Sequence, residues 1–286
     1  KSDYKGENMF GKVLSYSWPL IFAEIIWRIF KWTDSFFIGY FRSATEVGLY
    51  NAAIPIALLL TFSSDLFMQM FVPLINKEYS KNNMEVVKSL SQQVGKWIFF
   101  TNLPVLMILF LFPEEVLTIL FGVEFISAAN SLKILTIGIL FLSFSGVSTR
   151  ILGMKGKSKM ILSDIAITGA LNLLLNIFLV PIKGIDGAAI ATSISLSILS
   201  AIFIVQAYRE TKIIPIRRKN LNIFISAVIS LTLLLIVKNF IIITILSFII
   251  LTIFLFAFYI LLVFILNGFD RSDVMILKSF LNKIKR

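Results

Sequence analysis

The chain has 286 residues, of which 58% are hydrophobic, and its formal net charge is +11. Only 15% of the residues are charged, and the 28 Phe outnumber the 16 Asp and Glu together. This balance is typical of integral membrane proteins and argues against a soluble catalytic domain. The sequence contains no Cys and no His, which excludes disulfides, thiolate or imidazole metal sites and a Ser-His-Asp triad. We therefore expect neither an enzyme nor a cofactor.

Long continuous apolar runs predict helices that cross a membrane, because a span needs about 20 apolar residues and must satisfy its backbone internally. We predict an all-α integral membrane protein with eight transmembrane helices. They cover residues 13–41, 46–75, 94–113, 131–153, 160–181, 186–208, 221–238 and 241–266. The polar segment 83–93 is compatible with a surface helix that leads into the third span. Residues 114–130 form the longest loop on the opposite side.

Basic residues concentrate in alternate connections of the chain. The N-terminal tail, segments 76–96, 150–159 and 209–219, and the C-terminal tail hold 21 of the 27 Lys and Arg. The positive-inside rule places these segments, and with them both ends of the chain, in the cytoplasm of a cell-membrane protein. The positive charge is thus a property of loops on one side of a membrane, and no nucleic-acid partner is expected.

The first span carries four charged residues at spacings of four, three and three: Glu24, Arg28, Lys31 and Asp34. These spacings place them on one helical face within about 120°. Each isolated charge at the bilayer centre costs on the order of 2.5–3.5 kcal/mol, so they should face a bundle interior or a wet cavity. The pairs Glu24–Arg28 and Lys31–Asp34 could instead only neutralise one another. In the other interpretation, the four charged residues line a cavity that handles an ionic substrate.

Three further spans carry polar groups. In the second span Asp65 stands beside Ser63, Ser64 and Gln69, and hydrogen bonding between helices explains the serines better than it explains Asp65. The fourth span has small hydroxyl residues before Arg150, which is expected to extend to the cytoplasmic interface. The fifth span has a stripe with a period of four residues, formed by Asp164, Thr168, Asn172 and Asn176. Packing between helices is the expected role of the two Asn side chains.

Three stretches occur in the order typical of one transporter family. They are TDSFFIGYFRSATEVGLYNAA (33–53), ILFGVEFISAANSLKIL (119–135) and LNLLLNIFLVPIKGIDGAAIATSIS (171–195). Together they resemble the second half of the polysaccharide flippase branch of the multidrug/oligosaccharidyl-lipid/polysaccharide (MOP) exporter superfamily, over most of residues 10–208. The resemblance implies a MATE-like lobe of six helices (1–208), followed by two additional helices and a basic tail (209–286).

The resemblance also implies a function. The chain would form the second lobe of a transporter that flips a polyprenyl-(di)phosphate-linked glycan to the outer leaflet by alternating access. Arg28 and Lys31 would meet the phosphate, in a cavity shared with Glu24, Asp34 and Asp65. The implied partners are membrane lipid, the lipid-linked glycan, a first lobe that this chain lacks, and the glycosyltransferases or polymerase that build the glycan.

Three alternatives compete with this function. A cation-coupled multidrug exporter of the same superfamily would use the acidic groups Glu24, Asp34 and Asp65, although Arg28 and Lys31 argue against it. A scaffold of a glycan-assembly complex would pack the charged face of the first span dry against another helix. A membrane glycosyltransferase or polymerase would need acidic catalytic pairs or large outer loops, and the loop at 114–130 is small and largely apolar.

Overall fold

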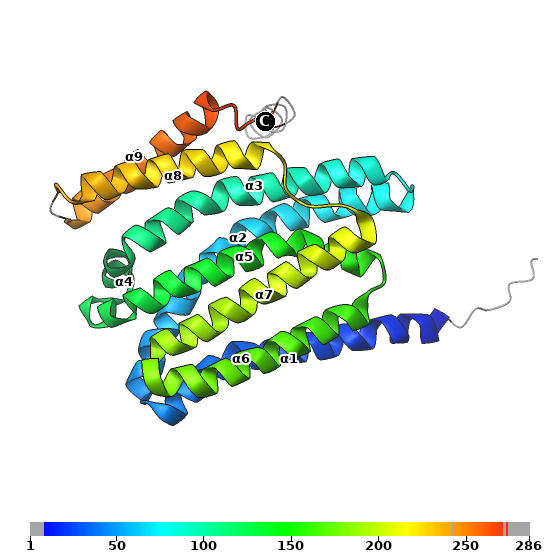
Figure 1. Cartoon of the computed structure of the whole chain (residues 1–286), viewed down its shortest axis with the longest axis horizontal. Coiled ribbons are helices and arrows are strands. Elements are labelled where there is room, and N and C mark those ends of the chain that lie inside the picture. The colour runs from blue at the N-terminus through cyan, green and yellow to red at the C-terminus, as the bar shows by residue number, and fades with distance from the viewer. Residues whose placement is uncertain (1–8, 242, 271–272, 274–286) are drawn as a thin grey trace, which may run out of the picture.

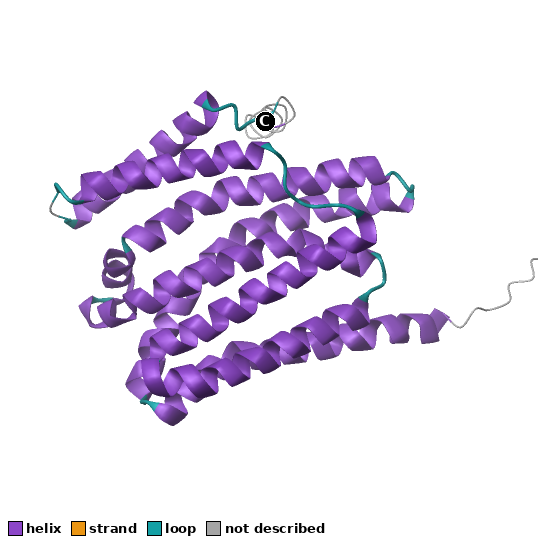
Figure 2. Cartoon of the chain, viewed as in Figure 1, coloured by secondary structure: helices purple, strands orange, loops and turns teal. Residues whose placement is uncertain are grey.

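The computed structural model describes residues 9–241, 243–270 and 273. Within these residues the regular structure is entirely helical (Figure 2). The elements are α1 (Met9–Phe41), α2 (Ala44–Ser80), α3 (Met84–Leu111), α4 (Pro113–Phe121), the 3-10 helix η1 (Val123–Ala128), α5 (Ala129–Met154), α6 (Ser158–Lys183), α7 (Ile185–Thr211), α8 (Lys219–Lys238) and α9 (Ile245–Ile265).

Eight of these helices are long and apolar enough to cross a membrane, which confirms the predicted number of spans. Two local expectations differ from the structure. The helix expected at 83–93 is present and leads into the third span, but it is not a separate element, because α3 runs without interruption from Met84 to Leu111. The expected loop at 114–130 is largely helical, since Pro113 starts the short helix α4 and η1 follows directly after Gly122.

The spans lie side by side, and their connections gather at two ends (Figure 1). One end, here called the basic end, holds the start of α1 and the connections 81–83, 155–157 and 212–218. The opposite end holds α4, η1 and the turns between α1 and α2, α6 and α7, and α8 and α9. The orientation of the basic end towards the cytoplasm stays a prediction from the charges.

Small residues allow the closest helix contacts. α5 packs along α7, and a Cβ added to Gly138 would lie 2.4 Å from the Cα of Ser193. α6 and α7 are joined through Gly184 alone, whose φ of +58° is a conformation that glycine adopts without strain. α1 packs mainly on α6. These contacts make α1, α2, α3, α5, α6 and α7 one compact lobe.

The helices α8 and α9 attach to this lobe through α3. A separate apolar core, which includes Met107 of α3, Ile223 of α8 and Leu255 of α9, lies between them. The hydroxyl of Tyr259 donates to the carbonyl oxygen of Phe100 at 3.0 Å. The division into a lobe at 1–208 and two additional helices at 209–286 stays a prediction, and this shared core shows how the second part is held.

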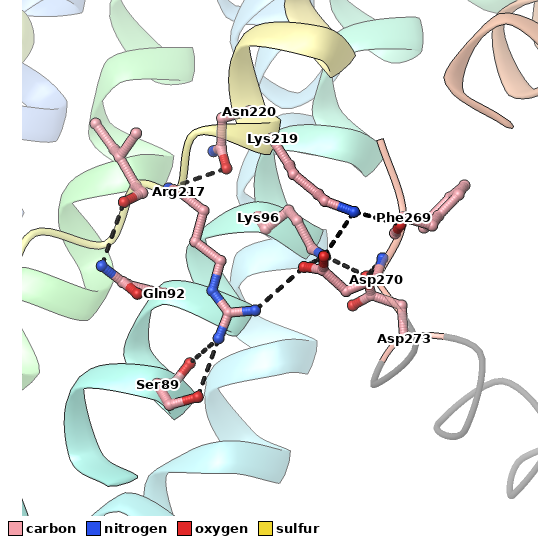
Figure 3. Close-up of polar contacts among 10 residues, drawn as sticks. Ser89, Gln92, Lys96, Arg217, Lys219, Asn220, Phe269, Asp270 and Asp273 are labelled. Atoms are coloured by element: carbon pink, nitrogen blue, oxygen red, sulfur yellow. Dashed lines mark hydrogen bonds and ion pairs between the residues drawn. The ribbon is translucent and has the colours of Figure 1, made fainter. Parts of the chain in front are cut away.

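An ionic network fastens the segment after α9 to α3 at the basic end (Figure 3). Lys96 is 1% exposed, and its Nζ lies 2.9 Å from Asp270 and also contacts Asp273. Lys219 and Arg217, from the start of α8 and the linker before it, reach the same Asp270 at 2.7 and 3.3 Å. The network therefore ties together α3, the linker 212–218 and the residues that follow α9.

Replacing Lys96 should destabilise the chain strongly, because the buried carboxylate of Asp273 would lose its cation. Breaking a buried pair from one side typically costs about 3–5 kcal/mol. We expect Lys96→Met to lower the free energy of unfolding by such an amount in denaturant titrations in detergent micelles. Lys88→Met, which removes an exposed cation from the same helix, should change it by less than about 0.5 kcal/mol. Equal effects of the two variants would contradict a structural role for the network.

The network also predicts a dependence on pH. Partial burial raises the pKa of Asp270, but hydrogen bonds from Lys219 and Lys96 outweigh it and lower this pKa from 3.8 to about 2. A carboxyl with a lowered pKa stabilises the fold above its unfolded pKa, and the contribution is lost as the pH falls through the folded value. We expect the thermal midpoint to fall between about pH 4 and about pH 2. The fall should be smaller for Asp270→Asn and unchanged for the control Glu85→Gln.

Candidate functional site

A polar cavity of 450 Å³ lies between α1, α2 and α5, with α6 and α7 contributing apolar side chains to its wall. Glu24 of α1, Asp65 of α2 and Arg150 of α5 line it. All three are exposed in the isolated chain. The cavity thus brings together charges of both signs from three helices, and a ligand with both anionic and hydroxyl groups would find complementary partners there.

Hydroxyl groups form part of the wall of the cavity and link α2 to α5. Ser64 donates to the carbonyl oxygen of Ser143 at 2.9 Å. Ser63 donates to Asn102 of α3 at 2.5 Å, and the amide of Asn102 donates to the hydroxyl of Ser143 at 2.8 Å. Ser63 and Ser64 of the second span therefore bond between helices, as expected, and Ser143 of the fourth span does so too. Asp65 stays outside this network.

Glu24, Arg28 and Lys31 lie on the exposed side of α1 but line three different hollows, and Asp34 is buried. Glu24 and Arg28 pair at 3.4 Å, with their side chains 60% and 75% exposed. Arg28 lines an apolar hollow of 430 Å³ beside Trp32 and Leu173, apart from the polar cavity. Lys31 lies on the exposed side of α1, with its Nζ 5.9 Å from the ring centre of Trp27. It lines a smaller pocket of 110 Å³, which shares Trp27 with the polar cavity.

Asp34 points into the lobe and makes no ion pair with Lys31, although the spacing of three residues would allow that pair. It is 4% exposed. Tyr50 of α2 and Thr192 of α7 each donate to its Oδ2 at 2.5 Å, and Asn176 of α6 donates to its Oδ1 at 2.8 Å. Asn172 donates to the hydroxyl of Thr192 at 3.0 Å. Asp34 therefore joins four helices through hydrogen bonds to neutral groups.

Two buried acceptors of this cluster lack a donor. The Oδ1 atoms of Asn172 and Asn176 are buried and have no hydrogen-bond partner. A half turn of either amide would exchange its oxygen with its nitrogen. After such a half turn, the two oxygens would join Asp34 and Thr192 in a set of hard ligands with a single negative charge, which suits a monovalent cation better than a divalent one. No group of three acidic or sulfur or imidazole ligands occurs in the part of the chain that the structure describes.

Asp164 occupies a different setting from Asp34. It lies near the start of α6 and is 6% exposed. Gln206 of α7 donates to its Oδ1 at 3.0 Å. The stripe of α6 is thus divided, with Asp164 bound to Gln206 and the two Asn side chains bound around Asp34.

Sequence reasoning did not identify three residues of these sites. Arg150 was considered only as an interfacial residue, and the structure shows that it also lines the cavity. Tyr50 and Thr192 bind Asp34, and both lie within the stretches that carry the family resemblance. A threonine in an apolar helix gives no local signal of its partner, because its hydroxyl often bonds within its own helix. A tyrosine gives none because its ring fits an apolar span wherever its hydroxyl points.

Comparisons with known proteins agree with this architecture. A family described as polysaccharide biosynthesis protein matches residues 4–78. The uncharacterized membrane protein MJ1068 of Methanocaldococcus jannaschii is 25% identical over 86% of this chain and 50% of its own length. The probable low-salt glycan biosynthesis flippase Agl15 of Haloferax volcanii is 26% identical over 65% of this chain and 39% of its own length. The chain thus spans half or less of the length of these relatives.

Two solved structures share the fold. The lipid II flippase MurJ in an inward closed conformation superposes with a TM-score of 0.70 and 18% identity, over 95% of this chain and 57% of that protein. An outward-facing MATE family multidrug resistance transporter of the MOP superfamily gives a TM-score of 0.52 and 16% identity, over 78% of this chain and 52% of that protein. With the two sequence relatives, they support the resemblance found in the sequence: the chain is similar to the polysaccharide flippase branch of the MOP exporter superfamily and shares the fold of MOP transporters.

Proposed function

We propose that this chain is one lobe of a flippase that moves a polyprenyl-(di)phosphate-linked glycan from the cytoplasmic to the outer leaflet by alternating access. The observation that carries the proposal is the polar cavity among membrane-spanning helices, lined by Glu24, Asp65, Arg150 and several hydroxyls. Such a lining suits a phosphate and a glycan better than it suits a purely apolar solute. The similarity to a glycan flippase and to MurJ supports the same substrate class.

A second lobe is part of the proposal. The chain spans about half of the proteins that it resembles, and one lobe cannot close a central cavity alternately on two sides. The exposed side of α1, with Glu24, Arg28 and Lys31, would then face the space between the lobes. Arg28 can bind two phosphate oxygens at once, while Lys31 and Arg150 add positive charge nearby.

Asp34 would couple transport to a cation. A buried carboxylate without a basic partner favours binding of a proton or a metal cation, because an isolated negative charge in the interior is costly. The unpaired oxygens of Asn172 and Asn176 favour Na⁺ over a proton, since a metal ion would use them as ligands. The site joins α1 to α2, α6 and α7, so its occupancy would change how α1 is held beside the cavity.

Neutralising the cations of α1 tests the substrate site. In the whole transporter, Arg28→Gln or Lys31→Gln should reduce surface glycan in a flippase-deficient host by about tenfold, because each removes a charge-assisted phosphate contact. Arg28→Lys should restore only part of the activity. Lys183→Gln, an exposed cation at the opposite end, is the control.

The acidic residues separate the alternatives. Suppose that Glu24→Gln and Asp65→Asn stop export while the variants of Arg28 and Lys31 export normally. The cavity then favours cationic substrates, which supports the function of a multidrug exporter. If all four variants export normally but unfold at lower temperature, the charged groups of α1 and Asp65 of α2 are structural and the proposed substrate site is wrong.

Titration with Na⁺ tests the coupling site without requiring transport. We expect NaCl to raise the thermal midpoint of the purified chain above that measured in equal choline chloride, because a ligand of the folded state stabilises it. Asp34→Asn should abolish the difference. Asp164→Asn, which alters another buried carboxylate, should preserve it. A difference that survives Asp34→Asn would contradict the assignment of this site.

A further inference from the structure

A large apolar groove lies on the far side of α5 from the polar cavity. Its volume is 740 Å³, within the range of about 300–1,000 Å³ typical of small-molecule sites. It is lined by residues of α8 and the linker before it, of α5 and α7, and by Phe99 of α3. The groove exists because α8 packs on α3 and α9 rather than on α5 or α7.

Aromatic rings line the groove across three helices. The ring centre of Phe99, on α3, lies 5.2 Å from that of Phe144 on α5 and 6.4 Å from that of Phe224 on α8. Phe141 and Phe224 remain 46% and 49% exposed. The groove therefore presents a continuous apolar surface that a hydrocarbon chain can cover.

The groove is separate from the proposed substrate cavity. The two share no lining residue. They lie back to back across α5, where Ser143 and Ser145 face the cavity and Phe141 and Phe144 face the groove. A lipid in the groove is thus not placed to enter the cavity directly.

The end of the groove is closed by a linker that is fixed to α3. A Cβ on Gly95 would lie 2.0 Å from the carbonyl oxygen of Pro215, so the linker lies directly on the helix backbone. Arg217 donates to the carbonyl and hydroxyl oxygens of Ser89 at 3.1 and 3.0 Å, and Gln92 donates to the carbonyl oxygen of Ile216 at 3.4 Å (Figure 3). These contacts hold the groove's polar end in one position.

Arg218 supplies a charge at that end. Its neighbour Arg217 is bound to Asp270. Arg218 lines the groove, is exposed, and forms no ion pair with any residue that the structure describes. Lys212, in the same linker, does not line the groove. A cation at the mouth of an apolar groove near a membrane surface complements a lipid with an anionic headgroup.

The geometry points to a binding site for an anionic membrane phospholipid in this groove. A hydrocarbon chain lies over Phe141, Phe144 and Phe224, and the phosphate contacts the guanidinium of Arg218 at the basic end. The bound lipid fills the space between α8 and the pair α5 and α7, and so completes the packing of α8 against the lobe. This site is independent of the proposed flippase activity.

Native mass spectrometry and thermal unfolding in detergent test the site. The chain should retain phosphatidylglycerol in preference to phosphatidylcholine by about fivefold, the effect of about one basic side chain near the headgroups. Arg218→Gln should remove this preference, and Lys212→Gln should keep it. Ile204→Trp, which adds bulk to the groove without changing charge, should reduce retention of both lipids.

Three outcomes would overturn the site. If Arg218→Gln and Lys212→Gln reduced the preference for phosphatidylglycerol equally, the basic end in general, and not Arg218, would attract the anionic headgroup. Equal stabilisation by glycerol 1-phosphate would show that a headgroup alone suffices and that no chain occupies the groove. Loss of polyprenyl phosphate binding in Ile204→Trp, with phosphatidylglycerol binding unchanged, would assign the groove to the lipid of the substrate.

Discussion

A charge placed in hydrocarbon is costly unless other groups compensate it, and this constraint determines where the ionisable residues of the chain lie. Among the residues that the structure describes, most basic ones lie in or near the connections at the basic end. Lys96 is buried and meets two carboxylates. Asp34 is buried without a cation and receives three hydrogen bonds instead. Glu24, Arg28 and Lys31 remain on the exposed side of α1.

These settings favour different roles. Lys96 is fully compensated, so it stabilises the attachment of α8 and α9 and leaves no capacity for a ligand. Asp34 is compensated only by neutral donors, and two amide oxygens beside it have no partner. A cation that binds a buried carboxylate compensated only by neutral donors lowers the free energy of the site strongly. The exposed charges of α1 are already hydrated in the isolated chain, and they gain most from a partner that excludes water, such as a second lobe or an anionic substrate.

The sequence predicted the features that depend on local pattern. Hydropathy located eight spans, and the period of four in α6 identified Asn172 and Asn176 as one polar face. The sequence could not predict the hydrogen-bond partners of Asp34. A spacing of three residues allows contact with Lys31, but the side of α1 that carries Asp34 faces Tyr50 and Thr192, which lie 16 and 158 residues away in the chain. The contacts of Lys96 with Asp270 and Asp273 span 174 and 177 residues, so no local pattern reveals them.

The tight contact between α5 and α7 limits how this lobe can move. Gly138 lies so close to the backbone of Ser193 that even a methyl group would clash, and Ser193 donates to the carbonyl oxygen of Ile134 at 2.6 Å. Sliding one helix along the other would break these contacts, whereas rotation of the whole lobe would keep them. The linker before α8 is likewise held on Gly95 and Ser89. The packing therefore favours a lobe that moves as a rigid body and carries α8 and α9 with it.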